Sequence, residues 1–174
     1  MATYIFLALA TLALQSFAVI AASPCGIENW IETPWGTCVK VFKNAPISWS
    51  EAQTECRGRG GDLFMPEDQS QSAWFRGLAL QYYPLRAFWL GARYELHGDE
   101  GKGWYWQKLS GSEKLQYGEF SAGEPNMKLQ SLADSCLIFG SNLEWWDDDC
   151  SLKGPYIDTA CERPQTGGAD SVVG

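Results

Sequence analysis

After an apolar N-terminal segment, the first half of the chain shows a helical pattern of hydrophobic and polar residues. Residues 48–51, with the sequence SWSE, have the form of a capping box, in which the Ser and Glu side chains cap each other's backbone NH groups. This pattern predicts a helix that runs through about Cys56. The helix is expected to stop at the glycine-rich run 58–61.

A second helix is predicted after Pro66, where Asp68 and Gln71 form a cap pair. The helical period of the hydrophobic residues ends beyond Gln81. The residues expected on the inner face of this helix are Ala73, Trp74 and Leu78.

Beyond the second helix, the pattern changes to short runs rich in β-branched and aromatic residues. These runs predict strands at residues 88–92, 104–107, 136–139 and 156–161. Long stretches full of Gly, Ser, Asn and Asp separate them. Two helices followed by strands and long loops predict an α+β fold. Loops of this length in a compact domain usually carry function.

The apolar N-terminal segment, residues 1–22, has the character of a signal peptide. The polar pair Gln15 and Ser16 interrupts a stretch that is barely long enough to span a membrane, which disfavours an uncleaved anchor. Small residues suited to signal-peptidase cleavage stand at Ala18, Ala21 and Ala22. We therefore expect a secreted, extracellular protein without membrane insertion, and a flexible C-terminal tail over residues 164–174.

All six cysteines follow the apolar segment, and an even number of cysteines in a secreted chain predicts a disulfide framework. A zinc site is the competing interpretation. The chain has no CxxC pair and a single histidine, which argues against zinc. Spacing alone leaves many connectivities open. The cysteines are Cys25, Cys38, Cys56, Cys136, Cys150 and Cys161.

The charge balance narrows the range of partners. The formal net charge is −8 and the isoelectric point is about 4.6. Such an acidic surface repels nucleic acid, heparin-like polymers and anionic membranes, so we expect no nucleic-acid partner. The alternative is that the acidity simply keeps an extracellular protein soluble.

From Cys25 to Cys161 the chain resembles a long-form C-type lectin domain. The resemblance rests on the run FWLGA at 88–92, the Glu-Pro-Asn triplet at 124–126 and the Trp-x-Asp run at 145–147, in that order among the cysteines. It implies one C-type lectin-like domain over residues 23–163, with two helices, short antiparallel sheets and a long calcium-binding loop region. The disulfides it implies are Cys25–Cys38, Cys56–Cys161 and Cys136–Cys150.

The residues of the loop region 124–149 suit a hard cation. Calcium takes six to eight oxygen ligands, and gathering many carboxylates without a cation is costly. Taken singly, the triplet 124–126 is an ordinary turn and the run 147–149 a solvated acidic loop. Together with the order of the cysteines, they favour a metal site. The oxygen-bearing residues are Glu124, Asn126, Asp134, Asp147, Asp148 and Asp149.

The resemblance assigns roles within this set. It implies Ca²⁺ ligands at Glu124, Asn126, Asp134 and Asp147, and a cis peptide bond before Pro125. Two vicinal sugar hydroxyls would complete the coordination shell, accepting hydrogen bonds from amides and donating them to carboxylates. In the family, Glu-Pro-Asn goes with mannose-type sugars, so glycans ending in such sugars are the expected partners.

One position departs from the family's pattern. Counted back from Cys150, Trp146 occupies the place of an Asn ligand, and an indole has no oxygen to offer calcium. A second register places Asp147 there instead; we prefer the first because it preserves the cysteine spacing. Trp146, or Trp145, would compensate by stacking on a sugar, unless both are core or rim aromatics. A second calcium site is not expected, since Tyr94 stands where an acid is needed.

Three classes of function remain to be weighed. An enzyme is not expected, because His97 is the only histidine, in a loop-like segment, and no Ser or Cys nucleophile has a base partner. The predicted function is a secreted, calcium-dependent, mannose-type lectin for glycan recognition in innate immunity or for agglutination. The alternative is a lectin-like module that binds proteins, as an inhibitor, toxin subunit or receptor, without binding sugar. Since no coiled-coil stalk is present, high avidity would require a homodimer.

Overall fold

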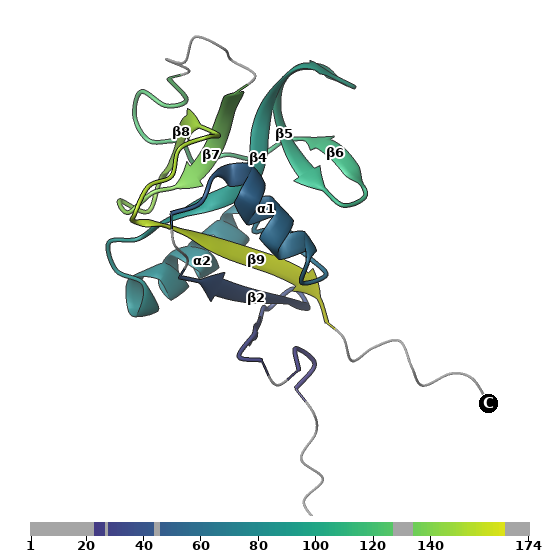
Figure 1. Ribbon diagram of the computed structural model, residues 1–174, viewed down its shortest axis with the longest axis vertical. Coiled ribbons are helices and arrows are strands. Elements are labelled where there is room, and N and C mark those ends of the chain that lie inside the picture. Colours follow the sequence, from purple (N-terminus) through teal and green to yellow (C-terminus); the bar gives the residue numbers. More distant parts are fainter. Residues whose placement is uncertain (1–22, 27, 44–45, 127–133, 166–174) are drawn as a thin grey trace, which may run out of the picture.

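The computed structural model describes residues 23–26, 28–43, 46–126 and 134–165. The predicted signal peptide, residues 1–22, lies outside the described residues, as do residues 166–174 of the predicted tail. Within the described part of the chain, two helices accompany strands joined into one nine-stranded network. The α+β class predicted from the sequence is therefore confirmed (Figure 1).

Helix α1 spans Trp49–Arg57 and begins where the capping box predicts. Ser48 Oγ accepts a hydrogen bond from the Glu51 NH at 3.4 Å, while the Glu51 carboxylate accepts one from the Ser48 NH at 2.7 Å. The two side chains satisfy backbone donors that the first turn of a helix leaves without partners. The buried face of α1 consists of Trp49, Ala52, Gln53 and Cys56.

Helix α2 spans Gln69–Tyr82, and Asp68 caps it by accepting a hydrogen bond from the Gln71 NH at 2.9 Å. The predicted helix and cap are confirmed, but its predicted inner face is partly wrong. Ala73 is exposed and Trp74 is half-buried. Trp74 still packs against the core, and the buried face also includes the polar residue Ser72, which hydrogen-bonds to Glu119. The buried residues are Ser72, Phe75, Leu78 and Ala79.

The strand network has the order β1-β2-β9-β4-β5-β6, with β3 on β9, β7 on β4 and β8 on β7. Figure 1 labels β2 and β4 to β9 of this network. Strands β4 and β9 pair in parallel, and the other pairs of named strands are antiparallel. The strands are β1 Ile31–Glu32, β2 Thr37–Phe42, β3 Asp62–Leu63, β4 Ala87–Gly98, β5 Gly101–Lys108, β6 Gly111–Lys114, β7 Ser135–Phe139, β8 Trp145–Asp149 and β9 Ile157–Pro164.

The four predicted strands are confirmed as parts of β4, β5, β7 and β9, whereas the other five were not predicted. Two expectations about loops are wrong. The acidic run 147–149 belongs to β8, which pairs along its whole length with the buried strand β7. His97 is exposed near the end of β4 rather than in a loop, because the β4–β5 hairpin extends beyond its hydrophobic part.

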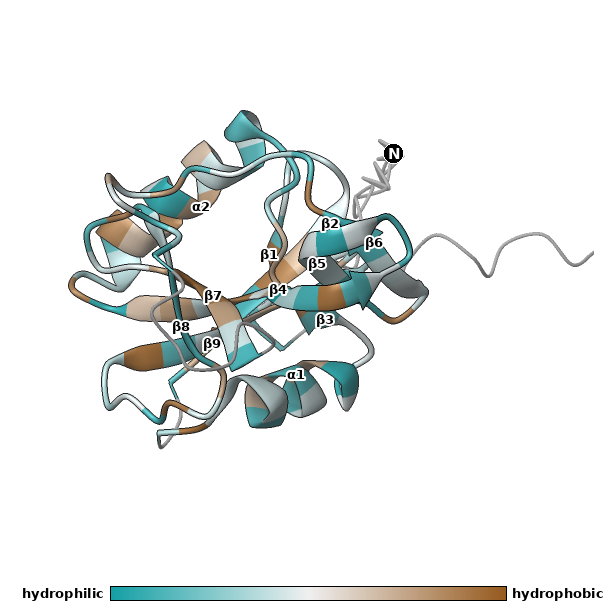
Figure 2. Cartoon of the chain, turned by 90° about the horizontal axis from the view of Figure 1, so that it is seen from above, coloured by the Kyte–Doolittle hydropathy of each residue, from teal (hydrophilic) through white to brown (hydrophobic). Residues whose placement is uncertain are grey.

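Two hydrophobic clusters lie on opposite sides of the sheet. Figure 2 shows α2 on one side of the strands and α1 on the other. Alternation along β4 places Phe88 and Leu90 in the cluster on the α2 side and Trp89 in the cluster with α1. Both clusters contain fully buried aromatic rings, of which Trp89 and Trp145 are the largest. The site described below lies beside the cluster that contains Trp145.

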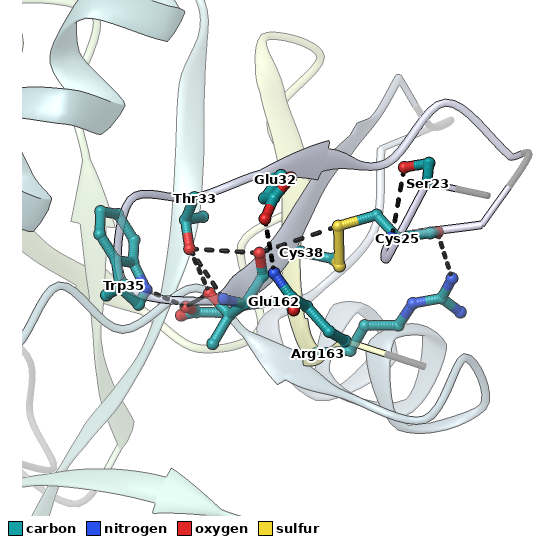
Figure 3. Close-up of a disulfide and its surroundings, with 10 residues drawn as sticks. Ser23, Cys25, Glu32, Thr33, Trp35, Cys38, Glu162 and Arg163 are labelled. Carbon is teal, nitrogen blue, oxygen red and sulfur yellow. Dashed lines mark hydrogen bonds between the residues drawn. A yellow bond between two sulfur atoms is a disulfide. The ribbon is translucent and has the colours of Figure 1, made fainter. Parts of the chain in front are cut away.

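The three disulfides implied by the resemblance are all present, and the described residues include no free cysteine. Cys56–Cys161 joins α1 to β9, and Cys136–Cys150 joins β7 to the residue that follows β8. Cys25–Cys38 holds the N-terminal segment against β2 (Figure 3).

We expect Gly61→Ala to lower stability by about 1–3 kcal/mol, as overpacking does. A Cβ at Gly61 would lie 2.1 Å from the backbone oxygen of Glu162, which cannot move without disturbing β9. Gly77→Ala is the matched control, because Gly77 lies in α2 with no atom within 4 Å of the added Cβ. That change should stabilise the protein by up to about 1 kcal/mol through helix propensity. Thermal unfolding of both variants tests the prediction, and equal melting temperatures would contradict it.

Candidate functional site

The candidate site is built where the segment before Pro125 runs beside β8. The Ser121 NH donates to the Trp145 oxygen at 2.9 Å, and the Trp145 NH donates to the Glu119 oxygen at 2.9 Å. Phe120 forms a parallel bridge with Trp145. Through these contacts residues 119–121 lie along β8 at the edge of the sheet, which fixes the chain just before the site.

A charged pair ties this segment to α2. The Glu119 carboxylate forms an ion pair with Arg76 at 2.7 Å and accepts a hydrogen bond from the Ser72 hydroxyl. Burial opposes ionisation of Glu119, but its hydrogen bonds with Ser72 and Tyr117 and the Arg76 charge lower its pKa overall. Glu119 is therefore held as a carboxylate, and it anchors the loop to α2.

The chain then turns toward β8. The Glu124 NH donates to the Ser121 oxygen at 2.9 Å, and Gly123 takes a left-handed φ of +86°, a conformation that glycine adopts readily. The Glu124–Pro125 peptide bond is cis, as the resemblance implies. The turn places the side chains that flank Pro125 above Asp147.

Three of the predicted ligands meet at this point. The Asn126 backbone NH donates to Asp147 Oδ1 at 2.7 Å and to Glu124 Oε2 at 3.1 Å. The Asn126 side-chain amide donates to Glu124 Oε1 at 2.6 Å. Asp147 is only 6% exposed, and its place in β8 opposite Leu137 fixes its position. A buried carboxylate, a second carboxylate and an amide thus form one compact polar cluster.

The electrostatics of this cluster follow from its contacts. Burial disfavours the charged form of Glu124, but hydrogen bonds with Asn126 and Asp147 outweigh burial and lower the pKa of Glu124. Glu124 is therefore ionised at neutral pH, close to a second, buried acid. A carboxylate beside a second carboxyl group places several hard oxygens close together, and such oxygens are the ligands that calcium takes.

The donor set of Glu124, Asn126 and Asp147 is made of hard oxygens, which suit calcium. Three side chains supply fewer than the six to eight oxygens that calcium takes, so backbone carbonyls, water and a bound ligand would supply the rest. Among the described residues, no group of three or more His, Cys, Asp or Glu residues is arranged to hold a metal. The described residues therefore supply only part of a calcium coordination shell, from two carboxyl groups and one amide.

Asp134 is not brought to this cluster. It is exposed, and its backbone oxygen accepts a hydrogen bond from the Cys150 NH at 2.8 Å. It lines a separate cavity with Asp149 and Ser48, near the start of α1. Residues 127–133, which join Asn126 to Asp134, lie outside the described residues.

The two tryptophans of β8 lie in different surroundings. Trp145 is fully buried and makes edge contacts with Trp106 at 6.0 Å and Tyr117 at 5.6 Å between ring centroids. Trp146 is half-buried, packs against the cluster that contains α1, and lies so close to Gly140 that a Cβ there would come within 2.3 Å of its ring. Strand alternation places Trp146 on the face of β8 opposite Asp147.

Sequence reasoning missed the residues that hold the site in place. Glu119, Arg76, Ser72 and Ser121 position the loop, but they are ordinary polar residues in a chain rich in them. The only available signal was Ser72, a polar residue at a position that helical spacing puts between hydrophobic ones.

Two helices on either side of a sheet, three disulfides and an oxygen-rich loop beside β8 define a lectin-like binding domain. The sequence profile of the family described as Lectin C-type domain matches residues 45–163. The chain therefore belongs to the C-type lectin domain family, whose members are generally non-enzymatic binding modules and typically bind Ca²⁺.

Individual relatives are distant. The chain is 21% identical over 141 residues to human lymphocyte antigen 75, covering 79% of this chain but 7% of that protein. Its fold matches the cow CD23 carbohydrate-recognition domain, solved in the presence of a GlcNAc2Man3 oligosaccharide, with a TM-score of 0.63 and 22% identity over 80% of this chain and 96% of that one. It also matches herring type II antifreeze protein, with a TM-score of 0.60 and 20% identity over 79% and 97% of the two chains. At these identities the likeness concerns the fold.

In the described part of the chain, no helix has both the length and the apolar character needed to cross a membrane.

Proposed function

We propose that this protein is a secreted, calcium-dependent lectin that binds glycans ending in mannose-type sugars. The observation that carries the proposal is the direct contact of Glu124 and Asn126 with each other and with the buried Asp147. A calcium ion bound to these oxygens would offer open positions to two sugar hydroxyls. Recognition of foreign glycans or agglutination of cells is the biological role that such a site would serve.

The order of donors and acceptors supports the mannose-type preference. A carboxylate at Glu124 accepts hydrogen bonds from a hydroxyl, whereas the amide of Asn126 donates one. In the structure these two side chains bond to each other, and a bound ion would separate them. An acid on one side of the ion and an amide on the other would then favour one orientation of the equatorial 3- and 4-hydroxyls of mannose. Galactose has an axial 4-hydroxyl and fits this arrangement less well.

We expect the protein to be retained on a mannose resin in calcium and to be released by EDTA. Free mannose, and also glucose, N-acetylglucosamine and fucose, should compete better than galactose in the same assay. The preference should be modest, because each neutral hydrogen bond contributes about 0.5–1.5 kcal/mol and the place of one Asn ligand is taken by Trp146. Galactose that competes as well as mannose would refute the roles proposed for Glu124 and Asn126.

A matched pair of variants sharpens this test. Glu124→Gln removes a carboxylate from the cluster, whereas Glu144→Gln removes an exposed one whose side chain contacts Asn142. The first variant should lose retention and the second should keep it. Melting curves in EDTA verify that both are folded.

The second candidate function is a lectin-like module that binds a protein and no sugar. Two observations favour it: Trp146 lies on the face of β8 opposite Asp147, and Asp134 lines a different cavity. The herring antifreeze protein illustrates that a function other than the lectin one accompanies this fold. Failure of every sugar to bind in calcium, with the protein folded, would assign the chain to this second class.

A further inference from the structure

A second cavity, of about 430 Å³, lies away from the Glu124 cluster, between the end of α1, the start of α2 and the β5–β6 turn. This volume falls within the range of small-molecule sites, which is about 300–1,000 Å³. Its apolar walls come from Trp35, Met65 and Leu109, and its floor includes Gly61 and the carboxyl group of Glu162.

Glu162 is half-buried in this cavity and is held by neutral donors. Its Oε1 accepts hydrogen bonds from the Trp35 indole NH at 2.7 Å and from the Thr37 hydroxyl at 2.5 Å (Figure 3). Burial, together with the nearby Glu67 carboxylate, raises the pKa of Glu162 in spite of these hydrogen bonds. The carboxyl group is therefore fixed in orientation, but its charge is not compensated by its hydrogen-bond donors.

The other acidic groups that line the cavity already have cationic partners. Glu67 forms an ion pair with Lys108 at 2.5 Å, and Asp62 forms one with Arg57 at 3.2 Å. Arg163 also lines the cavity, but its guanidinium lies over the Trp30 ring at 4.1 Å and donates to the Cys25 oxygen at 3.1 Å. Among the described residues, Glu162 is the carboxylate of this cavity that forms no ion pair.

We propose that this cavity binds a small organic ammonium ion, an amine with one aromatic or alkyl group, whose charged head pairs with Glu162. The head would supply the cation that Glu162 lacks, and charge-assisted hydrogen bonds of this kind are about twice as strong as neutral ones. The Trp35 ring borders the same space and attracts cations through its face. Met65 and Leu109 would contact the apolar body of the ligand.

The residues that line the cavity favour an amine over other classes of ligand. A carboxylate ligand would be repelled by Glu162, and a neutral apolar ligand would offer its carboxylate no opposite charge. The donors beside Glu162, from Trp35 and Thr37, are already used, so a sugar hydroxyl would compete with them for the same carboxylate oxygen. This site is independent of the Glu124 cluster, so it stands whether or not the protein binds sugar.

The test uses 2-phenylethylamine, which is protonated at pH 7, and 2-phenylethanol as its neutral counterpart. We expect the amine to shift the indole NH signal of Trp35 in a ¹H–¹⁵N NMR titration, in a saturable manner in the millimolar range. The signal is assigned by its loss in Trp35→Phe. The alcohol should bind at least about tenfold more weakly, which corresponds to about 1.4 kcal/mol.

Two variants locate the charge that the amine recognises. Glu162→Gln keeps an oxygen that accepts from Trp35 and Thr37, and should weaken amine binding at least about tenfold. Glu113→Gln is the matched control, because it removes the carboxylate that contacts Lys108 from outside the cavity, and should leave amine binding unchanged. Should Glu162→Gln fail to fold, Leu109→Lys replaces an exposed rim residue with a cation and should weaken amine binding similarly.

Each other outcome overturns the proposal. Equal binding of the amine and the alcohol would mean that the cavity is only an apolar hollow. Unchanged amine binding in Glu162→Gln, or no shift of the Trp35 signal, would remove the assigned role of the carboxylate. Displacement of the amine by calcium would mean that Glu162 serves a metal ion.

Discussion

Asp147→Asn should abolish the calcium-dependent gain in stability while leaving the calcium-free protein about as stable as before. The Asp147 carboxylate is buried in β8 and lies close to the Glu124 carboxylate through their shared contact with Asn126. Without calcium, a neutral amide of the same shape keeps an oxygen that accepts from the Asn126 NH, and its NH2 group can donate to Glu124, so the calcium-free cluster loses little. With calcium, the same change removes a charged ligand and the ion is no longer held.

The magnitude of the effect in the unaltered protein follows from binding linkage. Extracellular modules bind calcium with dissociation constants of roughly 10⁻⁴ to 10⁻³ M, so about 10 mM calcium is up to 100-fold above the constant. Binding to the native state alone then stabilises it by up to about 2.7 kcal/mol. For a domain of this size, the melting temperature should rise by on the order of 5–10 °C. In Asp147→Asn the rise should disappear.

Melting curves in calcium and in EDTA measure this difference, and Asp148→Asn is the matched control. Asp148 is the next residue of β8 and lies on the opposite face of the strand, so its replacement should leave the calcium response unchanged. A full calcium response in Asp147→Asn would exclude Asp147 as a ligand. A wild-type protein that melts at one temperature in calcium and in EDTA would exclude the site as a whole.

The parts of the fold that the sequence predicts are those that depend on local signals. The capping box at 48–51 and the cap pair of Asp68 and Gln71 hold two helix starts through contacts three residues apart. Four strands are visible as runs of apolar and aromatic residues, most of which are buried in the structure. The disulfides follow from the order of the cysteines only because that order resembles a known family.

Strand β8 could not be predicted for a physical reason. Three of its five residues are aspartates, which have low strand propensity, and the strand is held by pairing with the buried strand β7. Similarly, the Arg76–Glu119 pair that anchors the site joins residues far apart in the chain. Neither residue differs from an ordinary surface charge when read from the sequence.

The candidate site was predicted from the resemblance. The structure brings three of its four predicted ligands together and places the fourth apart from them. Glu124, Asn126 and Asp147 come together because a turn at Ser121 and the strand β8 place them so. Asp134 lies next to Cys150 instead. Its role as a ligand stays a prediction, since it depends on the course of residues 127–133.

Removing the Cys56–Cys161 disulfide by a double Cys→Ala exchange should cause the largest loss of stability among the three bridges. It closes a loop of 105 residues, whereas the other two close loops of 13 and 14 residues. In the chain-entropy account, a 100-residue loop contributes about 4.7 kcal/mol and a 15-residue loop about 3 kcal/mol. Because domains of this kind are stable by only about 5–15 kcal/mol, the long-loop variant should be close to unfolding at 37 °C. Urea unfolding of all three double variants in EDTA measures the ranking.

A comparison of the two short disulfides separates the effect of loop entropy from the effect of where the disulfide lies in the fold. Cys25–Cys38 and Cys136–Cys150 close loops of nearly equal length, so their removal should lower stability in EDTA by similar amounts. Only Cys136–Cys150 joins β7 to the end of β8, the strand that carries Asp147. The precise position of the Asp147 carboxylate decides how well the site binds an ion. Removal of Cys136–Cys150 should therefore weaken the calcium response, while removal of Cys25–Cys38 should leave that response intact. Equal calcium responses in the two variants would mean that the β7–β8 pairing alone positions Asp147. A weaker calcium response without Cys25–Cys38 than without Cys136–Cys150 would place the calcium site elsewhere.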